Sequence, residues 1–219
     1  MMENIKKYTE KYFIRYKKVI EQYYPTHGNR GFAEQNMTIQ FASTIEDAGD
    51  DVFTWYEAPV PKREGENRSG RMDAVIFDQT GSNIFLVESK NIYTTTEIKK
   101  VGRDINRICD PKVCETVKKS LIITPSPDFT FYGVVLASVW LNGNQERDKI
   151  YKSWINENFL NEYKKELSID PKKTPVEHCM PIYDNIAYTA IQPAHQHKDC
   201  EHKFCHALLA LVFEVCKGK

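Results

Sequence analysis

Two carboxylates and one ammonium group lie within a short stretch of the sequence, residues 71–90. Asp73 stands near its start, and Glu88, Ser89 and Lys90 close it. Two acids placed together repel, and each raises the pKa of the other unless a cation lies between them. Mg²⁺ supplies such a cation, because it takes oxygen ligands and typically binds one or two carboxylates together with substrate phosphate. A charged lysine is no metal ligand, but it can orient or deprotonate a metal-held water, or neutralise charge on a phosphate. The residue types therefore suit metal-assisted hydrolysis of a phosphodiester bond.

A β-hairpin is predicted to bring these residues together. Residues 74–77 and 84–87 are rich in β-branched and aromatic side chains, and the residues between them are typical of a turn. A symmetric turn places Asp73 directly opposite Glu88, and opposed residues of an antiparallel pair have Cβ atoms about 4.5–5.5 Å apart. Because side chains alternate along a strand, Lys90 is expected on the same face as Glu88, and the serine between them on the other face.

Both faces of the predicted hairpin are apolar, which indicates a sheet covered by helices on both sides. We therefore expect an α/β fold in layers and not a surface β-ribbon. The two faces consist of Val75, Phe77, Ile84 and Leu86 on one side, and of Ala74, Ile76, Phe85 and Val87 on the other.

The other elements are predicted from hydrophobic periodicity, capping residues and helix breakers. Helices are expected at residues 3–24, 31–47, 97–109, 146–167 and 204–216, and extended segments at residues 52–60, 120–123, 131–141 and 182–191. The helix at 97–109 is expected to end at Pro111, since proline cannot continue a helix.

The chain has an aspartate at position 73, then fourteen residues, then Glu88-Ser89-Lys90, and this pattern lies between apolar strands. The pattern resembles the motif of the PD-(D/E)xK nuclease superfamily, which has the restriction-endonuclease-like fold. Met72 stands where the family motif has proline. The predicted order of helix, strand, hairpin, helix and strand over residues 31–141 is similar to the family's αβββαβ core. The resemblance implies one nuclease-like domain over residues 1–219, with a mixed sheet flanked by helices, extra N-terminal and C-terminal helices, and a C-terminal elaboration over residues 142–219.

The resemblance also implies roles for the charged residues. Asp73 and Glu88 would hold Mg²⁺ or Mn²⁺, helped by the main-chain carbonyl of Ser89. Lys90 would position or activate the attacking water. The implied activity is metal-dependent hydrolysis of phosphodiester bonds in DNA, as in repair, restriction or defence.

Two further acids are candidates for the same site. The family often has an acid that reaches the metal near the start of the helix before its first strand, and Glu34 occupies that position. The alternative for Glu34 is a first-turn acid that is stabilised by the helix dipole. Glu57, in the strand predicted at residues 52–60, is a candidate accessory acid.

Basic residues are concentrated in two places beside the motif. The polar stretch 61–71 carries Lys62, Arg63, Arg68 and Arg71, and the polar face of the helix at 97–109 carries Lys99, Lys100, Arg103 and Arg107. Both sets could contact phosphates, and both could instead be solvated surface. The formal net charge of the chain is zero, so binding of nucleic acid can come only from such local patches.

A second cluster, rich in histidine and cysteine, leaves an alternative open. His195, His197, Cys200, His202, Cys205 and His206 lie within residues 195–206, and structural zinc is usually held by four such ligands. The usual pairs of cysteines with two residues between them are absent. His202 and His206 are expected one turn apart on the last helix. The alternatives to a nuclease are therefore a zinc-stabilised interaction module and a non-catalytic module that binds nucleic acid.

Composition is typical of one globular domain. The chain has 219 residues, of which 41% are hydrophobic, and no run of about 18 apolar residues that could span a membrane. The N-terminal residues lack the apolar segment of a secretory signal. The six cysteines are therefore better interpreted as reduced thiols of a cytoplasmic protein than as a disulfide framework. The sequence leaves the oligomeric state open, a homodimer included.

Overall fold

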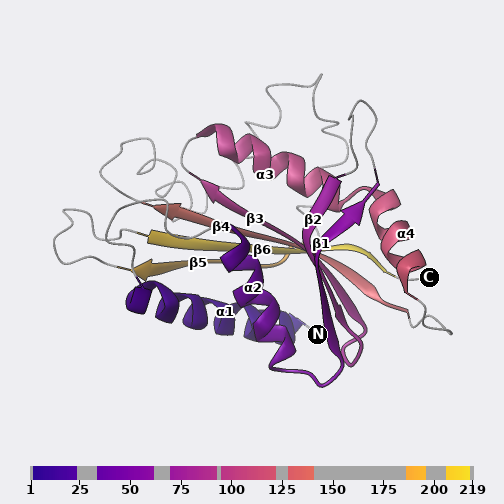
Figure 1. The fold of residues 1–219 in the computed structure, drawn as a ribbon, viewed down its shortest axis with the longest axis horizontal. Helices are drawn as coiled ribbons and strands as arrows, with labels where there is room; N and C mark the ends of the chain where they lie inside the picture. The colour runs from indigo at the N-terminus through magenta and orange to yellow at the C-terminus, as the bar shows by residue number, and fades with distance from the viewer. Residues whose placement is uncertain are drawn as a thin grey trace.

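A six-stranded mixed sheet lies at the centre of the computed structural model (Figure 1). The structure describes residues 2–23, 34–61, 70–92, 95–121, 128–140, 186–195 and 206–217. The helices are α1 (Met2–Tyr23), α2 (Glu34–Glu46), α3 (Thr95–Ile108) and α4 (Pro111–Ser120). The strands are β1 (Val52–Val60), β2 (Gly70–Asp78), β3 (Asn83–Ile92), β4 (Thr130–Trp140), β5 (Ile186–His195) and β6 (His206–Lys217), in the spatial order β1-β2-β3-β4-β6-β5.

The predicted hairpin forms β2 and β3, and its register is confirmed. The paired residues run from Asp78–Asn83 to Ala74–Val87. The pairing ends there, so Asp73 and Glu88 are the next residues along the two strands but do not form the predicted opposed pair. β3 then pairs in parallel with β4, whereas the other strand pairs are antiparallel. A parallel pair needs a long crossover connection, and α3 and α4 lie in it.

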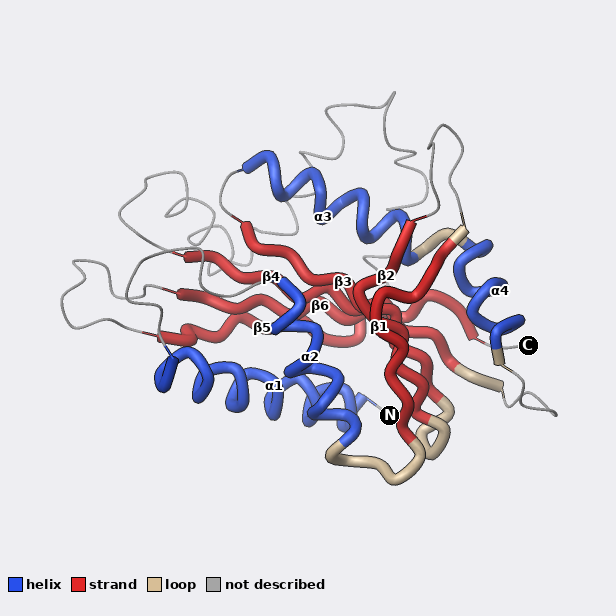
Figure 2. Tube along the Cα trace, in the orientation of Figure 1, coloured by secondary structure: helices blue, strands red, loops and turns tan. Residues whose placement is uncertain are grey.

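Helices cover both faces of the sheet, as the two apolar faces of the hairpin predict (Figure 2). α1 and α2 pack on one face, where Phe41 and Phe85 are buried. α3 and α4 pack on the other face, where Leu86, Ile105 and Val113 are buried. Alternation along β3 therefore directs its even-numbered side chains toward α3 and its odd-numbered side chains toward α2. The structure is thus an α/β fold with a mixed sheet between two layers of helices.

The side-chain alternation of the first two strands breaks at one level of the sheet. Along β1, Trp55 and Ala58 both lie on the α3 side although they are three positions apart. Glu57, between them, has a φ of 52°, which is unfavourable for a residue with a Cβ and costs about 1–3 kcal/mol. β2 changes face in the same way around Asp73, which lies opposite Glu57 in the register. Both strands therefore turn at a pair of acids.

Residues 206–217 form strand β6, so the helix predicted at 204–216 is wrong. Leu208 and Ala210 belong to the core on the α1 and α2 side, whereas Leu211 and Phe213 belong to the core on the α3 side. A strand buried on both faces has an almost continuous apolar sequence, and periodicity alone does not distinguish it from a buried helix. β6 pairs with both β4 and β5, so it is an interior strand.

Helix α4 is a second departure from the prediction, because Pro111 begins a helix as well as following one. Asp110 is the N-cap of α4, and its side chain accepts a hydrogen bond from Lys112 N at 3.0 Å. Proline suits the first position of a helix, where its missing N–H costs nothing. The strand expected from Ser120 therefore starts inside a helix. Apart from the additional helix α4, the elements from α2 to β4 follow the predicted order. The helix predicted at residues 146–167 lies outside the described residues.

Candidate functional site

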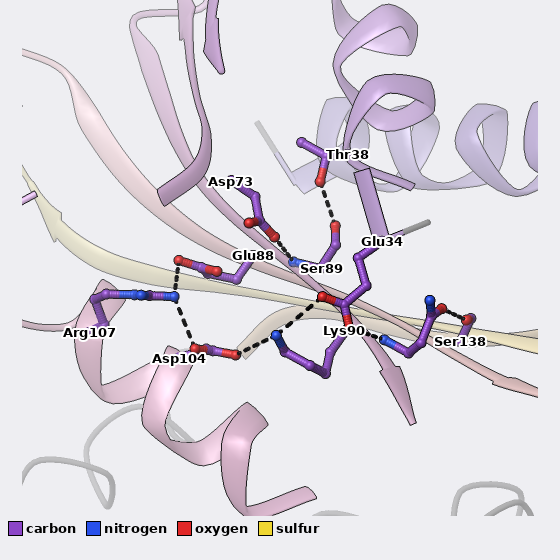
Figure 3. A network of polar contacts seen from close by, with 10 residues as sticks. Glu34, Thr38, Asp73, Glu88, Ser89, Lys90, Asp104, Arg107 and Ser138 are labelled. Atoms are coloured by element: carbon purple, nitrogen blue, oxygen red, sulfur yellow. Dashed lines mark hydrogen bonds and ion pairs between the residues drawn. The ribbon is translucent and has the colours of Figure 1, made fainter. Parts of the chain in front are cut away.

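Asp73 lies in β2, and its Oδ2 accepts a hydrogen bond of 2.7 Å from the main-chain N–H of Ser89 (Figure 3). Burial raises the pKa of the Asp73 carboxyl, and the hydrogen bond from Ser89 and the ammonium of Lys90 offset only part of this effect. The neighbouring carboxylates of Glu34 and Asp104 raise the same pKa further. Asp73 is therefore harder to ionise than a free aspartate, even with Lys90 beside it.

Glu88 lies in β3 and faces α3, with only 2% of its surface exposed. Arg107 Nη2 lies 2.5 Å from Glu88 Oε1. We interpret this as a contact between charges and not an aligned hydrogen bond, because within the described residues neither Glu88 Oε1 nor Arg107 Nε has a hydrogen-bond partner. Burial raises the pKa of the Glu88 carboxyl well above its ordinary value, although the guanidinium lowers it in part, and Asp73 raises it further. Arg107 thus supplies a cation beside Glu88, whose other neighbour is the acid Asp73.

Lys90 shares the α3 side of β3 with Glu88, as the sequence predicts. Its Nζ lies 3.4 Å from Glu34 Oε2 and 3.7 Å from Asp104 Oδ2. Burial alone would lower the pKa of Lys90, but the carboxylates of Asp104, Glu34 and Asp73 raise it above its ordinary value. A lysine in these surroundings keeps its proton at neutral pH. It can therefore neutralise developing charge, but it is not poised to act as a general base.

Glu34 and Thr38 connect the first turns of α2 to the end of β3. Glu34 Oε1 accepts a hydrogen bond from the main-chain N–H of Asn91 at 2.9 Å. One turn further along α2, the hydroxyls of Thr38 and Ser89 lie 2.7 Å apart. Asn91 in turn accepts a hydrogen bond from the hydroxyl of Ser138 on β4. Glu34 is a first-turn acid, but it also reaches the site, and α2 is tied to the strand that carries the motif.

Asp104 and Arg107 of α3 complete the charged network. Asp104 is not among the predicted residues, and Arg107 is predicted only as one of the basic residues on the polar face of this helix, not as a partner of Glu88. Arg107 Nη2 lies 3.0 Å from Asp104 Oδ1. Residues three positions apart share one side of a helix, and the neighbouring positions Val101, Ile105 and Ile108 are buried against the sheet. Two features of the sequence could have pointed to these residues: the polar strip beside the apolar face of the helix, and the need for a cation beside Glu88.

Four of the basic residues that could contact nucleic acid have described side chains: Arg71, Lys100 and Arg103 are exposed, and Arg107 is partly buried. Arg71 Nη1 lies 3.9 Å from Glu57 Oε2. Residues Lys62, Arg63 and Arg68 lie outside the described part of the chain, as does the side chain of Lys99. Exposed basic side chains therefore stand on α3, the helix that also carries Arg107.

The donor atoms of the site suit Mg²⁺ in type, although their present partners are other protein groups. No three or more His, Cys, Asp or Glu side chains of the described residues are grouped so as to hold a metal ion. Mg²⁺ needs fewer, because one or two carboxylates suffice when waters and other oxygens complete its shell. Asp73, Glu88 and the Ser89 carbonyl offer such hard oxygens, and Glu88 Oε1 is a buried acceptor without a hydrogen bond. A metal ion beside Glu88 would take over the charge that Arg107 now supplies.

The histidine and cysteine cluster lies mostly outside the described residues, which omit 196–205. Its flanking residues His195 and His206 are opposed in strands β5 and β6. Because His206 begins a strand, the predicted placement of His202 and His206 one helical turn apart is wrong. The described thiols of Cys109 and Cys114 form no disulfide.

A pocket of about 370 Å³ lies beside Asp73, between α2 and the first two strands. It lies at the level where β1 and β2 change face, which the sequence does not indicate. It is lined by Gln35, Thr38, Ile39, Tyr56, Glu57 and Asp73.

Among the described helices, none is both long enough and apolar enough to cross a membrane. No protein-family model, curated protein or solved structure matches the chain. A function for this protein is therefore inferred from its own residues and their geometry.

Proposed function

We propose that this protein is a Mg²⁺-dependent nuclease of the PD-(D/E)xK superfamily, with a restriction-endonuclease-like core, and that it hydrolyses phosphodiester bonds in DNA. The observation that carries the proposal is the convergence of Asp73, Glu88 and Lys90 on adjacent strands, with Glu34 reaching Lys90 from α2. Acids whose pKa is raised by burial and by one another are typical of functional sites. The element order from α2 to β4 supports the same family.

Asp73, Glu88 and the main-chain carbonyl of Ser89 are the groups that would hold the metal. When bound, the ion supplies a Lewis acid and a more acidic water. Lys90 neutralises negative charge that develops on the phosphate, and Glu34 and Asp104 hold its ammonium in place beforehand. A charge that is already oriented costs no reorganisation during the reaction, which is why such groups are effective.

Arg107 and the metal are expected to compete for Glu88, and thermal unfolding can test this. Removing one partner of a buried ion pair typically costs about 3–5 kcal/mol, since the other charge is left unpaired. Arg107→Gln should therefore lower the melting temperature strongly in EDTA, and added Mg²⁺ should restore part of the loss. The matched control is Arg103→Gln, which changes an exposed arginine one turn earlier on α3. An equal effect of Mg²⁺ on wild type and Arg107→Gln would contradict the competition.

The proposed activity is tested by incubating the protein with single-stranded and double-stranded DNA and RNA, with and without Mg²⁺. We expect cleavage of DNA that requires Mg²⁺, stops with EDTA and is strongly reduced in Lys90→Ala. Absence of cleavage with every substrate would refute the nuclease assignment. Cleavage that Lys90→Ala leaves unchanged would show that the activity does not come from this site, and cleavage of RNA alone would refute the choice of DNA.

A further inference from the structure

The pocket beside Asp73 is not used by the mechanism above, although it borders the same site. Two of its walls are large side chains that remain open to solvent, Ile39 at 42% exposure and Tyr56 at 41%. Among the described residues, the other large hydrophobic side chains exposed to this degree are Ile14 and Phe53. Exposed apolar side chains that gather at a concave place indicate a binding site more strongly than the same side chains scattered singly.

Tyr56 provides a neutral aromatic wall in this pocket. Partial burial and the carboxylate of Glu46 raise the pKa of the Tyr56 hydroxyl, and a hydrogen bond with Thr54 offsets part of that effect. Thr54 itself donates a hydrogen bond of 2.5 Å to Glu46 Oε1. The ring is therefore an uncharged surface that belongs to a connected group of side chains on β1 and α2.

The acids that line the pocket restrict what it can accept. Glu57 and Asp73 both contribute carboxylates, which repel an anion such as phosphate. Gln35 adds an amide that can accept or donate. These carboxylates disfavour an anionic occupant and favour one with N–H donors at its edge, and the walls of Ile39 and Tyr56 favour one with apolar faces. A nucleobase has this combination, because its faces stack on aromatic rings and its exocyclic amino groups donate hydrogen bonds.

The position of the pocket connects such a base to the proposed chemistry. Asp73 borders the pocket and is also a proposed metal ligand, so a strand whose phosphate lies at the site would carry a neighbouring base to the pocket mouth. A base of a duplex must be both unpaired and unstacked before it can enter, whereas an unpaired base has only to leave the stack, so the pocket favours unpaired bases.

We propose that this pocket binds one unstacked nucleobase next to the cleaved bond, and that the substrate is a single-stranded or locally unpaired nucleic acid. The inference rests on the proposed nuclease function for the placement of the phosphate. Tyr56 and Ile39 contact the faces of the base, and Glu57 and Gln35 receive its edge.

Binding of a single-stranded oligonucleotide that carries the fluorescent base 2-aminopurine tests this assignment. The measurement uses Ca²⁺ in place of Mg²⁺, since Ca²⁺ also takes oxygen ligands, and gel electrophoresis verifies that the strand stays intact. We expect the single strand to bind more tightly than the matched duplex. Stacking of one base on an aromatic side chain is worth about 1–3 kcal/mol, so Tyr56→Ala should weaken single-strand binding about 5- to 150-fold. Tyr56→Phe keeps the ring and should stay within about twofold of wild type.

The matched control is Phe53→Ala, which removes another exposed aromatic side chain of β1. Phe53 stacks on Phe77 and does not line the pocket, so its loss should leave oligonucleotide binding unchanged. Circular dichroism of each variant verifies that it is folded. Equal binding of single strand and duplex, with no effect of Tyr56→Ala, would overturn the inference.

The same variants separate this inference from the proposed function. If Mg²⁺-dependent cleavage is found but Tyr56→Ala changes neither binding nor the preference for single strands, the base pocket is wrong and the nuclease stands. If no substrate is cut but single strands bind in a manner that depends on Tyr56, the nuclease is wrong and the pocket stands as a binding site for an unpaired base, without a cleaved bond beside it.

Discussion

Asp73→Asn is expected to abolish cleavage and, at the same time, to stabilise the metal-free protein at neutral pH. The asparagine side-chain oxygen can still accept the hydrogen bond from Ser89 N, so the hairpin keeps its local geometry. The asparagine side chain has no negative charge, however, so it is a much poorer metal ligand than the aspartate carboxylate. Because a bound metal contributes several kcal/mol to stabilising the transition state, the rate should fall about 10³-fold or more.

The change in stability follows from the raised pKa of Asp73 in the folded protein. Folding favours the protonated acid, so its contribution to stability is fully present below the pKa of the unfolded chain. That contribution is lost as the pH rises through the higher pKa of the folded state. In EDTA, the melting temperature of Asp73→Asn should therefore exceed that of wild type at neutral pH, and the two should converge in acid. Full activity in the variant, or a difference independent of pH, would contradict this account.

Glu88→Gln serves as the comparison. It should also lose activity, but its effect on the stability of the folded protein should differ. Glu88 faces Arg107, whose guanidinium would lose this buried anion and keep Asp104 as its remaining partner. The free energy of unfolding should then fall, by up to about 3–5 kcal/mol for a broken buried pair. Because burial also raises the pKa of Glu88 well above its ordinary value, removing its charge should offset part of this loss at neutral pH. The melting temperature of Glu88→Gln should therefore stay below that of Asp73→Asn, and a higher value would contradict a stabilising pair with Arg107.

Lys90→Ala is expected to lower the rate about 10²–10³-fold while leaving metal binding intact. The ammonium of Lys90 is held between Glu34 and Asp104, and its pKa is raised, so its role is that of a fixed positive charge. Removing one preorganised group that stabilises developing charge typically costs this amount. Lys90→Arg keeps the charge and should recover most of the activity, as measured by initial cleavage rates at saturating Mg²⁺.

The alternative role for Lys90 is general base, and the same variants test it. An arginine does not release its proton, so a Lys90→Arg protein as inactive as Lys90→Ala would favour the base. Loss of Mg²⁺ binding in Lys90→Ala, measured by calorimetry, would instead show that Lys90 organises the ligands. Lys119→Ala is the matched control, because it removes an exposed lysine of α4 outside the charged network.

The sequence predicts those parts of the site that depend on strand periodicity. Alternation and a symmetric turn suffice to place Glu88 and Lys90 on one side of β3, and they predict the pairing of β2 with β3 as far as Ala74–Val87. Glu34 is predicted only through the family resemblance, and the structure shows that it contacts Lys90.

Contacts that depend on packing between layers could not be predicted in the same way. Arg107 and Asp104 are ordinary members of a polar helix face until α3 packs above β3. Tyr56 and Glu57 form a pocket wall only because β1 departs from regular alternation at a residue with positive φ. β6 fails for a related reason, since burial on both faces removes the periodicity from which a strand is recognised.

The interior position of β6 has a consequence for the order in which the protein folds during synthesis. β1 to β4 are contiguous in the first 140 residues, and most of their contacts can form as soon as these residues leave the ribosome. β4 pairs with β6, which is separated from it by residues 141–205, so one edge of β4 stays open until residues 206–217 have been made. An unpaired apolar edge is a template for association with other chains. Nascent chains that stall between β4 and β6 are therefore the species of this protein most prone to aggregate, and chaperone binding should be concentrated there.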